Sequence, residues 1–141
     1  AGVMDIPMLI TEQYPEGLGP TVETLAELAP EDAFFSKLHF SSAKNTAIKG
    51  KIDTLNAKQI VIAGIEAHVC VLQTTIELLE AGYACFVVGD ATSSRKAANH
   101  AAGLARLREV GAEIVTSEMV VFEWLEKAGT PQFREMSRFL K

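Results

Sequence analysis

Short apolar runs alternate with segments of helical periodicity along most of the chain. The runs Gln59–Gly64 and Ala84–Gly89 are continuously apolar, as in strands that are buried on both faces of a parallel sheet. Between them, residues from about His68 to Glu80 have the spacing of an amphipathic helix. The apolar stripe of that helix consists of Val69, Leu72, Ile76 and Leu79. This alternation predicts an α/β fold built on a parallel sheet.

The remaining segments extend the same alternation over the whole chain. Further strands are expected at Ile6–Thr11, Ala33–Ser36 and Glu113–Thr116. Further helices are expected from Pro20 to Leu28, over residues 45–55, from about Arg95 to Val110 with Ser93 or Ser94 as N-cap, from Ser117 through Leu125, and after Pro131. Gln13 to Pro20 is expected to be a loop. The predicted order is β-α-β-α-β-α-β-α-β-α-α in one domain over residues 1–141, with ligands bound beyond the carboxyl ends of the strands.

Composition and charge exclude several classes of protein. The formal net charge is −5 and Lys and Arg form no cluster, which argues against nucleic acid as a partner. The hydrophobic fraction of 48% argues against disorder. Apolar runs of about four to six residues are too short to span a membrane, and the first ten residues lack the basic segment of a signal peptide. With only two cysteines, we expect a reducing compartment, the cytoplasm.

Cys70 is the first candidate for chemistry. It follows the strand that ends at Gly64 and lies in the first turn of the next helix. Unpaired N–H groups and the positive end of the helix dipole stabilise a thiolate at such a position, and a thiolate is a strong nucleophile. The alternative is that Cys70 is a small buried hydrophobic residue. Cys85 lies within an apolar strand, where the buried role is expected.

Lys37 is the second candidate. It follows the strand Ala33–Ser36, so it is expected at the same edge of the sheet as Cys70. A lysine beside a cysteine stabilises the thiolate and can transfer protons. The alternative is an ordinary solvated lysine in a loop.

Metal and phosphate sites have no support in the spacing of the candidate ligands. His39, His68 and His100 form no H-x-H or H-x-x-x-H pair, and the cysteines form no C-x-x-C motif. The chain also lacks a Walker motif and a G-x-G-x-x-G loop. No metal and no organic cofactor are expected.

Five short segments occur along the chain in an order that is specific to one family. In chain order they are Thr11–Pro15, Lys37–Ser41, Gly64–Cys70, Asp90–Arg95 and Gly111–Thr116. Together they resemble the isochorismatase-like cysteine hydrolases, in the subgroup described as isochorismatase domain-containing proteins. The resemblance implies a three-layer α/β/α sandwich of Rossmann-like type, with Cys70 as nucleophile and Lys37 as catalytic lysine.

The resemblance also implies how the rest of the site is built. A cis peptide bond is expected between Ile65 and Glu66, and the backbone N–H groups of Glu66 and Cys70 are expected to form the oxyanion hole. Side chains around Tyr14, Leu38 and His68 are expected to shape the substrate pocket. The metal-binding Asp and His set of nicotinamidase-like members has no counterpart after the strand Ile6–Thr11.

One element of the family pattern lies outside these residues. The general base of the family is an Asp on a first, central strand, and no segment before Ile6 can supply that strand. We therefore expect that the 141 residues belong to a longer chain of roughly 180–190 residues. Without the central strand, the edges of its two neighbours would leave backbone groups unpaired, so we expect the isolated piece to be insoluble or molten.

The sequence thus predicts a hydrolase that uses a catalytic triad and a covalent acyl-enzyme intermediate. The predicted substrate is a small carbonyl compound, an amide or related C–N compound. The alternative is a non-catalytic family member that serves as an oligomeric scaffold or binding protein. A homo-oligomer is expected from the resemblance and from apolar residues near the C-terminus, which are Phe133, Met136, Phe139 and Leu140.

Overall fold

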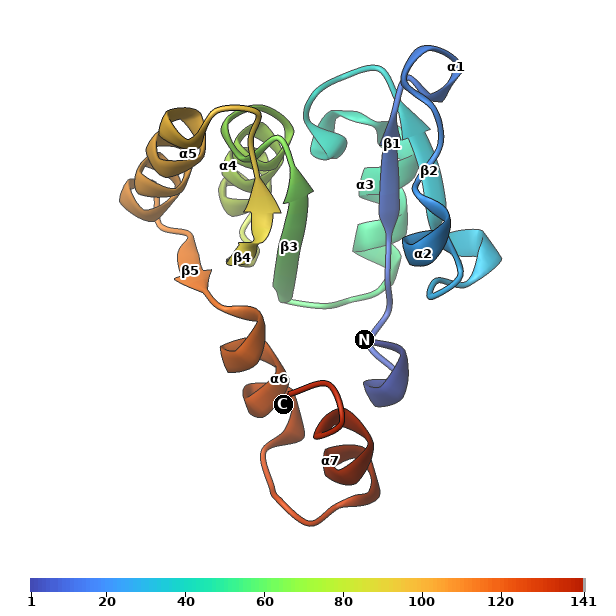
Figure 1. Ribbon diagram of the computed structural model, residues 1–141. Coiled ribbons are helices and arrows are strands. Elements are labelled where there is room, and N and C mark those ends of the chain that lie inside the picture. The colour runs from blue at the N-terminus through green and yellow to red at the C-terminus, as the bar shows by residue number, and fades with distance from the viewer. Residues whose placement is uncertain (141) are drawn as a thin grey trace. The chain divides into compact units, whose positions relative to one another are not determined.

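A computed structural model describes residues 1–140 of the chain (Figure 1). The chain forms two compact units. One unit combines Ala1–Ser36 with the segment that starts at Glu118, and the other is Lys37–Ser117. The candidate residues Lys37, Cys70 and His68 all belong to the second unit. One domain over residues 1–141 stays a prediction.

The second unit is built on a parallel three-stranded sheet. Its strands are β3 (Gln59–Ile65), β4 (Ala84–Ser93) and β5 (Glu113–Val115), in the order β3-β4-β5. Ile62 lies opposite Val87, which in turn lies opposite Ile114. The register of β3 against β4 shifts between Ile62 and Gly64. Because the strands are parallel, their carboxyl ends meet at one edge of the sheet, as the sequence predicts.

Two helices cover one face of this sheet (Figure 1). They are α4 (Leu72–Glu80) and α5 (Ala97–Glu109). Their apolar side chains pack with strand residues into the main core cluster. Its members are Val71, Leu72, Val87, Leu107 and Ala112, with Ile62, Ile76, Leu79, Leu104 and Ile114 packed against them. The predicted stripe of Leu72, Ile76 and Leu79 is therefore part of the core.

The strand β3 differs from its prediction. Its residues alternate between exposed and partly buried positions, with Val61 38% exposed and Ile65 71% exposed. The prediction of a strand buried on both faces is wrong for β3 in this structure. The reason is that the alternate side chains of β3 point away from the face that α4 and α5 cover.

A short segment of helical turns leads from β2 to β3. It contains a 3₁₀ turn, η3 (Ser42–Lys44), and the helix α3 (Thr46–Thr54). The Asn45 side chain caps α3 by accepting hydrogen bonds from the backbone N–H groups of Ala47 and Ile48 at 3.0 and 3.2 Å. The predicted helix over residues 45–55 is confirmed.

The first unit contains a second sheet, in which β1 (Ile10–Gln13) pairs with β2 (Phe34–Lys37). Its helical elements are η1 (Gly2–Met4), α1 (Pro15–Leu18), α2 (Glu23–Ala26), η2 (Glu31–Ala33), α6 (Ser117–Leu125) and α7 (Pro131–Met136). The helix α6 begins at the last residue of the second unit, where Ser117 N donates to an Asp90 carboxylate oxygen at 2.8 Å.

Several predicted boundaries are wrong. The helix α5 begins at Ala97 after Lys96, with no side-chain cap, because Ser93 ends β4 and the Ser94 hydroxyl bonds to His68 instead. The predicted loop from Gln13 to Pro20 contains the single turn α1, which Pro15 starts. The strand β1 starts at Ile10, later than the expected Ile6.

Within residues 1–140 the strands form two sheets, and β1 does not pair with β3. The small size of the two sheets fits the expectation of a missing strand. The α/β class with a parallel sheet flanked by helices is confirmed. Residues 1–140 contain no helix whose length and apolar character would let it cross a membrane.

Candidate active site at Cys70

Cys70 lies in a wide helical turn between β3 and α4. The peptide bond between Ile65 and Glu66 is cis, and the π-helical turn η4 (Ala67–Val71) follows directly. The Val71 N–H donates to the Glu66 carbonyl at 3.2 Å, five residues back along the chain. This turn places Cys70 at the N-terminal end of α4, partly buried, and π-helical turns of this kind are frequent at functional sites.

Lys37 is buried at the end of β2, with only 4% of its surface exposed. Its ammonium group donates to the carbonyl oxygens of Phe40 at 2.9 Å and His39 at 3.2 Å. Burial lowers the pKa of Lys37, and a hydrogen bond and charge interaction with Cys70 oppose that effect. The ammonium group therefore lies beside the Cys70 thiol, and Lys37 is not the solvated lysine of the alternative reading.

A polar network lies next to η4, the turn that contains Cys70. Glu66 Oε1 accepts from Arg95 Nε at 2.9 Å. The buried Glu66 Oε2 makes no hydrogen bond to any described residue and lies 3.5 Å from His68 Nδ1. The ring of His68 bonds to Ser94 Oγ at 3.0 Å through Nδ1 and to Asn99 Nδ2 at 3.2 Å through Nε2.

This network connects the cysteine turn to the segment between β4 and α5. Ser94 lies in this segment and Asn99 in the first turn of α5, and each contacts one nitrogen of the His68 ring. Both ring nitrogens of His68 are thus engaged. The sequence predicted His68 in the pocket and Glu66 in the oxyanion hole. It did not predict the contacts of the His68 ring with Ser94 and Asn99, or that of Glu66 with Arg95. The motif Asp90–Arg95 was the only signal that this segment belongs near the site.

Gly103 allows the backbone of α5 to pack directly against the backbone of η4, the turn that contains Cys70. A Cβ atom at this position would lie 3.1 Å from both the Cα and the N of His68, and 3.2 Å from the carbonyl carbon of Ala67. Backbone atoms cannot move aside as a flexible side chain would. The packing of α5 against η4 therefore depends on the missing side chain of Gly103.

We expect Gly103→Ala to lower the free energy of unfolding by about 1–2 kcal/mol, because the clash exceeds the gain in helix propensity. Gly50→Ala is the matched control, since Gly50 lies in α3 with nothing within 4 Å of an added Cβ. The control should gain about 0.4–1 kcal/mol. Urea unfolding of both variants measures the difference. Equal stabilisation by the two substitutions would contradict the close packing.

Cys85 has the buried structural role that the sequence predicts. Its side chain is 2% exposed, and burial raises the pKa of its thiol to about 11. Its sulfur lies 4.0 Å from the Thr75 carbonyl oxygen of α4, at the limit of a weak S–H hydrogen bond. Cys85 is therefore an internal reference for the reactivity of Cys70.

The predicted substrate-pocket residues belong to different units. Tyr14 is in the first unit, whereas Leu38 and His68 are in the second. Leu38 is 73% exposed. A pocket formed by these three side chains stays a prediction, as does an oxyanion hole formed by the N–H groups of Glu66 and Cys70. Over residues 1–140, no group of three or more His, Cys, Asp and Glu side chains is arranged to hold a metal ion.

Comparison with known proteins places the chain in a family. Residues 2–119 match the model of the Isochorismatase domain. The mouse isochorismatase domain-containing protein 2A is 39% identical over 142 residues, which cover 100% of this chain and 67% of the mouse protein. The chain thus spans about two thirds of the length of that relative.

Solved structures show the same fold. A Caenorhabditis elegans structure described as MAR1 ribonuclease is 40% identical with a TM-score of 0.87, covering 96% of this chain and 70% of that chain. The Escherichia coli YcaC gene product, described as an octameric hydrolase of unknown specificity, has a TM-score of 0.83 over 99% of this chain and 78% of that chain. At 22% identity the latter shows the fold alone. From the domain match and the mouse relative, the chain belongs to the isochorismatase-like hydrolase family.

Proposed function

We propose that the protein is a cysteine-dependent hydrolase of small amides or related C–N compounds, which acts through an acyl-enzyme on Cys70. The observation that carries the proposal is the contact between the buried Lys37 ammonium and the thiol of Cys70 at the start of α4. A nearby positive charge and a helix N-terminus both favour the thiolate. The family to which the chain belongs supports hydrolysis as the reaction class.

The proposed reaction has two halves. In the first, the sulfur of Cys70 forms a bond to the substrate carbonyl carbon, the C–N bond breaks, and the nitrogen leaves with a proton. In the second, water attacks the thioester, the acid product leaves, and the sulfur regains its proton. The family pattern implies a carboxylate base that takes the proton of the thiol. Backbone N–H groups of Glu66 and Cys70 would hold the oxyanion.

Lys37 has two tasks in this proposal. Its positive charge stabilises the thiolate before attack, and its ammonium can supply a proton to the leaving nitrogen. The carbonyl oxygens of His39 and Phe40 favour the protonated form of the side chain in its buried position. The lowered pKa makes the ammonium a stronger acid than an exposed lysine would be.

We expect Cys70 to be alkylated far faster than Cys85 in the folded protein. A thiol with a pKa of about 11 carries very little thiolate at neutral pH, and Cys85 is also 2% exposed. Limiting iodoacetamide at pH 7, followed by peptide mapping, should label Cys70 at least about 10-fold faster. Equal labelling of the two cysteines would remove the case for an activated Cys70.

The reaction class is tested by a panel of small amides and related C–N compounds, with release of amine or ammonia as the readout. The C. elegans neighbour is described as a ribonuclease, so a fluorescent RNA belongs in the same panel. The proposal predicts amide hydrolysis that Cys70→Ala abolishes. RNA cleavage that survives Cys70→Ala, with no amide hydrolysed, would contradict it. Inactivity on the whole panel would favour the scaffold alternative.

Homo-oligomerisation and a cytoplasmic location stay predictions. The E. coli neighbour is described as octameric, and Phe139, one of the apolar C-terminal residues, is 75% exposed. An exposed aromatic side chain of this size is common at an interface between copies. No organic cofactor enters the proposed mechanism.

A further inference from the structure

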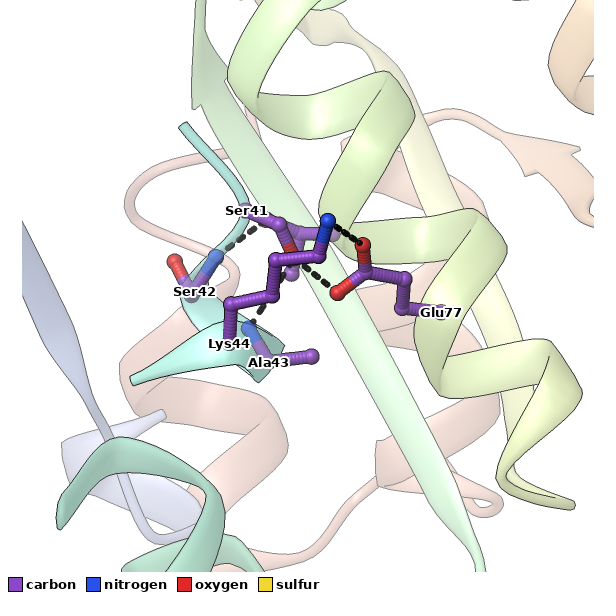
Figure 2. Close-up of polar contacts among 6 residues, drawn as sticks. Ser41, Ser42, Ala43, Lys44 and Glu77 are labelled. Carbon is purple, nitrogen blue, oxygen red and sulfur yellow. Dashed lines mark hydrogen bonds and ion pairs between the residues drawn. The ribbon is translucent and has the colours of Figure 1, made fainter. Parts of the chain in front are cut away.

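The helix α4, which follows the turn containing Cys70, also contacts the loop that follows Lys37. Figure 2 shows this contact, in which the side chains of Ser41 and Lys44 meet the Glu77 carboxylate of α4. Thr74 and Glu77 are one turn apart on the same face of α4, and Cys70 lies one turn before Thr74. The segments that carry Lys37 and Cys70 are therefore connected by a second set of contacts, away from the sulfur.

Three contacts make this second junction. Ser41 Oγ donates to Glu77 Oε2 at 2.7 Å, and the backbone N–H of Ser42 donates to Thr74 Oγ1 at 2.9 Å. Lys44 Nζ lies 3.3 Å from Glu77 Oε1 (Figure 2). The Ser42–Thr74 bond is buried, with Ser42 7% and Thr74 8% exposed. The Ser41–Glu77 bond is partly buried, because Ser41 is 1% exposed but the Glu77 side chain is 25% exposed.

The three contacts differ in what they contribute. The Lys44 side chain is 59% exposed, so its ion pair with Glu77 is screened by water and contributes little. A partly buried hydrogen bond from a hydroxyl to a carboxylate is stronger, and losing it leaves the buried hydroxyl proton of Ser41 without its acceptor. The Ser41–Glu77 and Ser42–Thr74 bonds are therefore the ones that fix the loop.

The fixed loop is the one whose carbonyl groups bind Lys37. The Lys37 ammonium donates to the carbonyl oxygens of His39 and Phe40, and Phe40 directly precedes Ser41 in the chain. If Ser41 and Ser42 shift relative to α4, the carbonyl oxygens of His39 and Phe40 move with them. The position of the ammonium relative to Cys70 then changes as well.

We propose that Glu77 and Thr74 are positioning residues of this enzyme, which fix the loop 38–42 on α4, directly after the turn of Cys70, and thereby hold the Lys37 ammonium at the sulfur. The inference rests on the proposed function, because it assigns these residues to the Lys37–Cys70 pair. Neither Glu77 nor Thr74 is proposed to touch the substrate. Both act through Ser41 and Ser42.

The test compares Glu77→Ala with Glu77→Gln and with Glu80→Ala. Glutamine can still accept from Ser41 but cannot pair with Lys44, and Glu80 is an exposed carboxylate at the end of the same helix. We expect Glu77→Ala to lower the rate of Cys70 alkylation by iodoacetamide at pH 7 about 10-fold, since small misplacements at a site have large effects on rate. Its pH profile should shift to higher pH. Glu77→Gln should stay within about 2-fold of the wild type, and Glu80→Ala should be unchanged.

A second pair of variants keeps the test valid if Glu77→Ala does not fold. Thr74→Val removes the acceptor for Ser42 at nearly constant volume, and Thr74→Ser restores it. We expect valine to slow alkylation of Cys70 and serine to rescue it. Thermal unfolding of each variant, monitored by circular dichroism, establishes that the alkylation rates are compared between folded proteins.

The outcomes separate this inference from the proposed function. If Cys70 of the wild type reacts no faster than Cys85, the proposed function fails. If Cys70 is reactive but Glu77→Ala and Thr74→Val react at the wild-type rate with an unchanged pH profile, the positioning role is wrong. A lower melting temperature without a change in alkylation would likewise overturn it, because that is the result of a purely structural contact.

Discussion

Cys70→Ala is expected to lower kcat for amide hydrolysis by at least about 1,000-fold while the protein stays folded. The reason is that alanine removes the atom that forms the acyl-enzyme, so no covalent intermediate can form. Cys70 is only partly buried, so its truncation leaves a smaller defect than the loss of a core side chain would. Initial rates on the best amide of the panel, with melting temperatures for both proteins, measure the effect.

Cys85→Ala is the matched control for this substitution. Cys85 is buried in β4, so its loss should lower stability by about 1 kcal/mol and leave kcat within about 2-fold. A Cys70→Ala variant that keeps more than a tenth of the wild-type kcat would contradict covalent catalysis. So would a larger loss of kcat in Cys85→Ala than in Cys70→Ala.

Lys37→Met is expected to lower kcat by about 100-fold or more, within the range of general acid–base catalysis. Methionine keeps a similar length but has no charge and no proton to give. Because burial lowers the pKa of Lys37, the ammonium loses its proton at lower pH than an exposed lysine would. The wild-type rate should therefore decline with rising pH, and the midpoint of the decline should lie below the ordinary pKa of a lysine. This decline should be absent in Lys37→Met.

Lys58→Met is the control for Lys37→Met, because Lys58 is exposed at the start of the β3 segment of the same unit. It should change neither kcat nor the pH profile. The role given to Lys37 is wrong if its methionine variant keeps the alkaline decline. It is also wrong if Lys58→Met and Lys37→Met have equal activity.

Periodicity predicted the elements of the second unit well because local and tertiary preferences agree there. The strands β3 and β4 and the helix α4 all lie where apolar spacing places them. The exposure of side chains was harder to predict. A strand is buried on both faces only if other elements cover both faces of its sheet, and the apolar pattern of the strand does not show whether they do. The alternating exposure of β3 is the clearest case. The burial of Leu78, at 1% exposure, also lies outside the single predicted stripe of α4.

The sequence predicted Cys70 and Lys37 as the candidate reacting residues, but it did not predict the side chains that contact the loop after Lys37. Cys70 and Lys37 have residue types that indicate chemistry, and each lies near the end of a strand, Lys37 at the end of β2 and Cys70 in the turn that follows β3. Ser41, Thr74 and Glu77 are ordinary residue types in a loop and on a helix face. Their role depends on contacts between positions 36 and 32 residues apart in the chain, which no local pattern encodes. The partners of His68 escaped prediction for the same reason.

In the proposed mechanism Cys70, activated by Lys37, forms a covalent acyl intermediate. The most direct test treats the protein with p-nitrophenyl acetate, stops the reaction with acid, and locates the acetyl group by peptide mass spectrometry. The account predicts a hydroxylamine-sensitive acetyl thioester on Cys70 that is absent in Cys70→Ala and forms more slowly in Lys37→Met. An acetyl group found on lysine side chains or Cys85, with Cys70 unmodified, would contradict it.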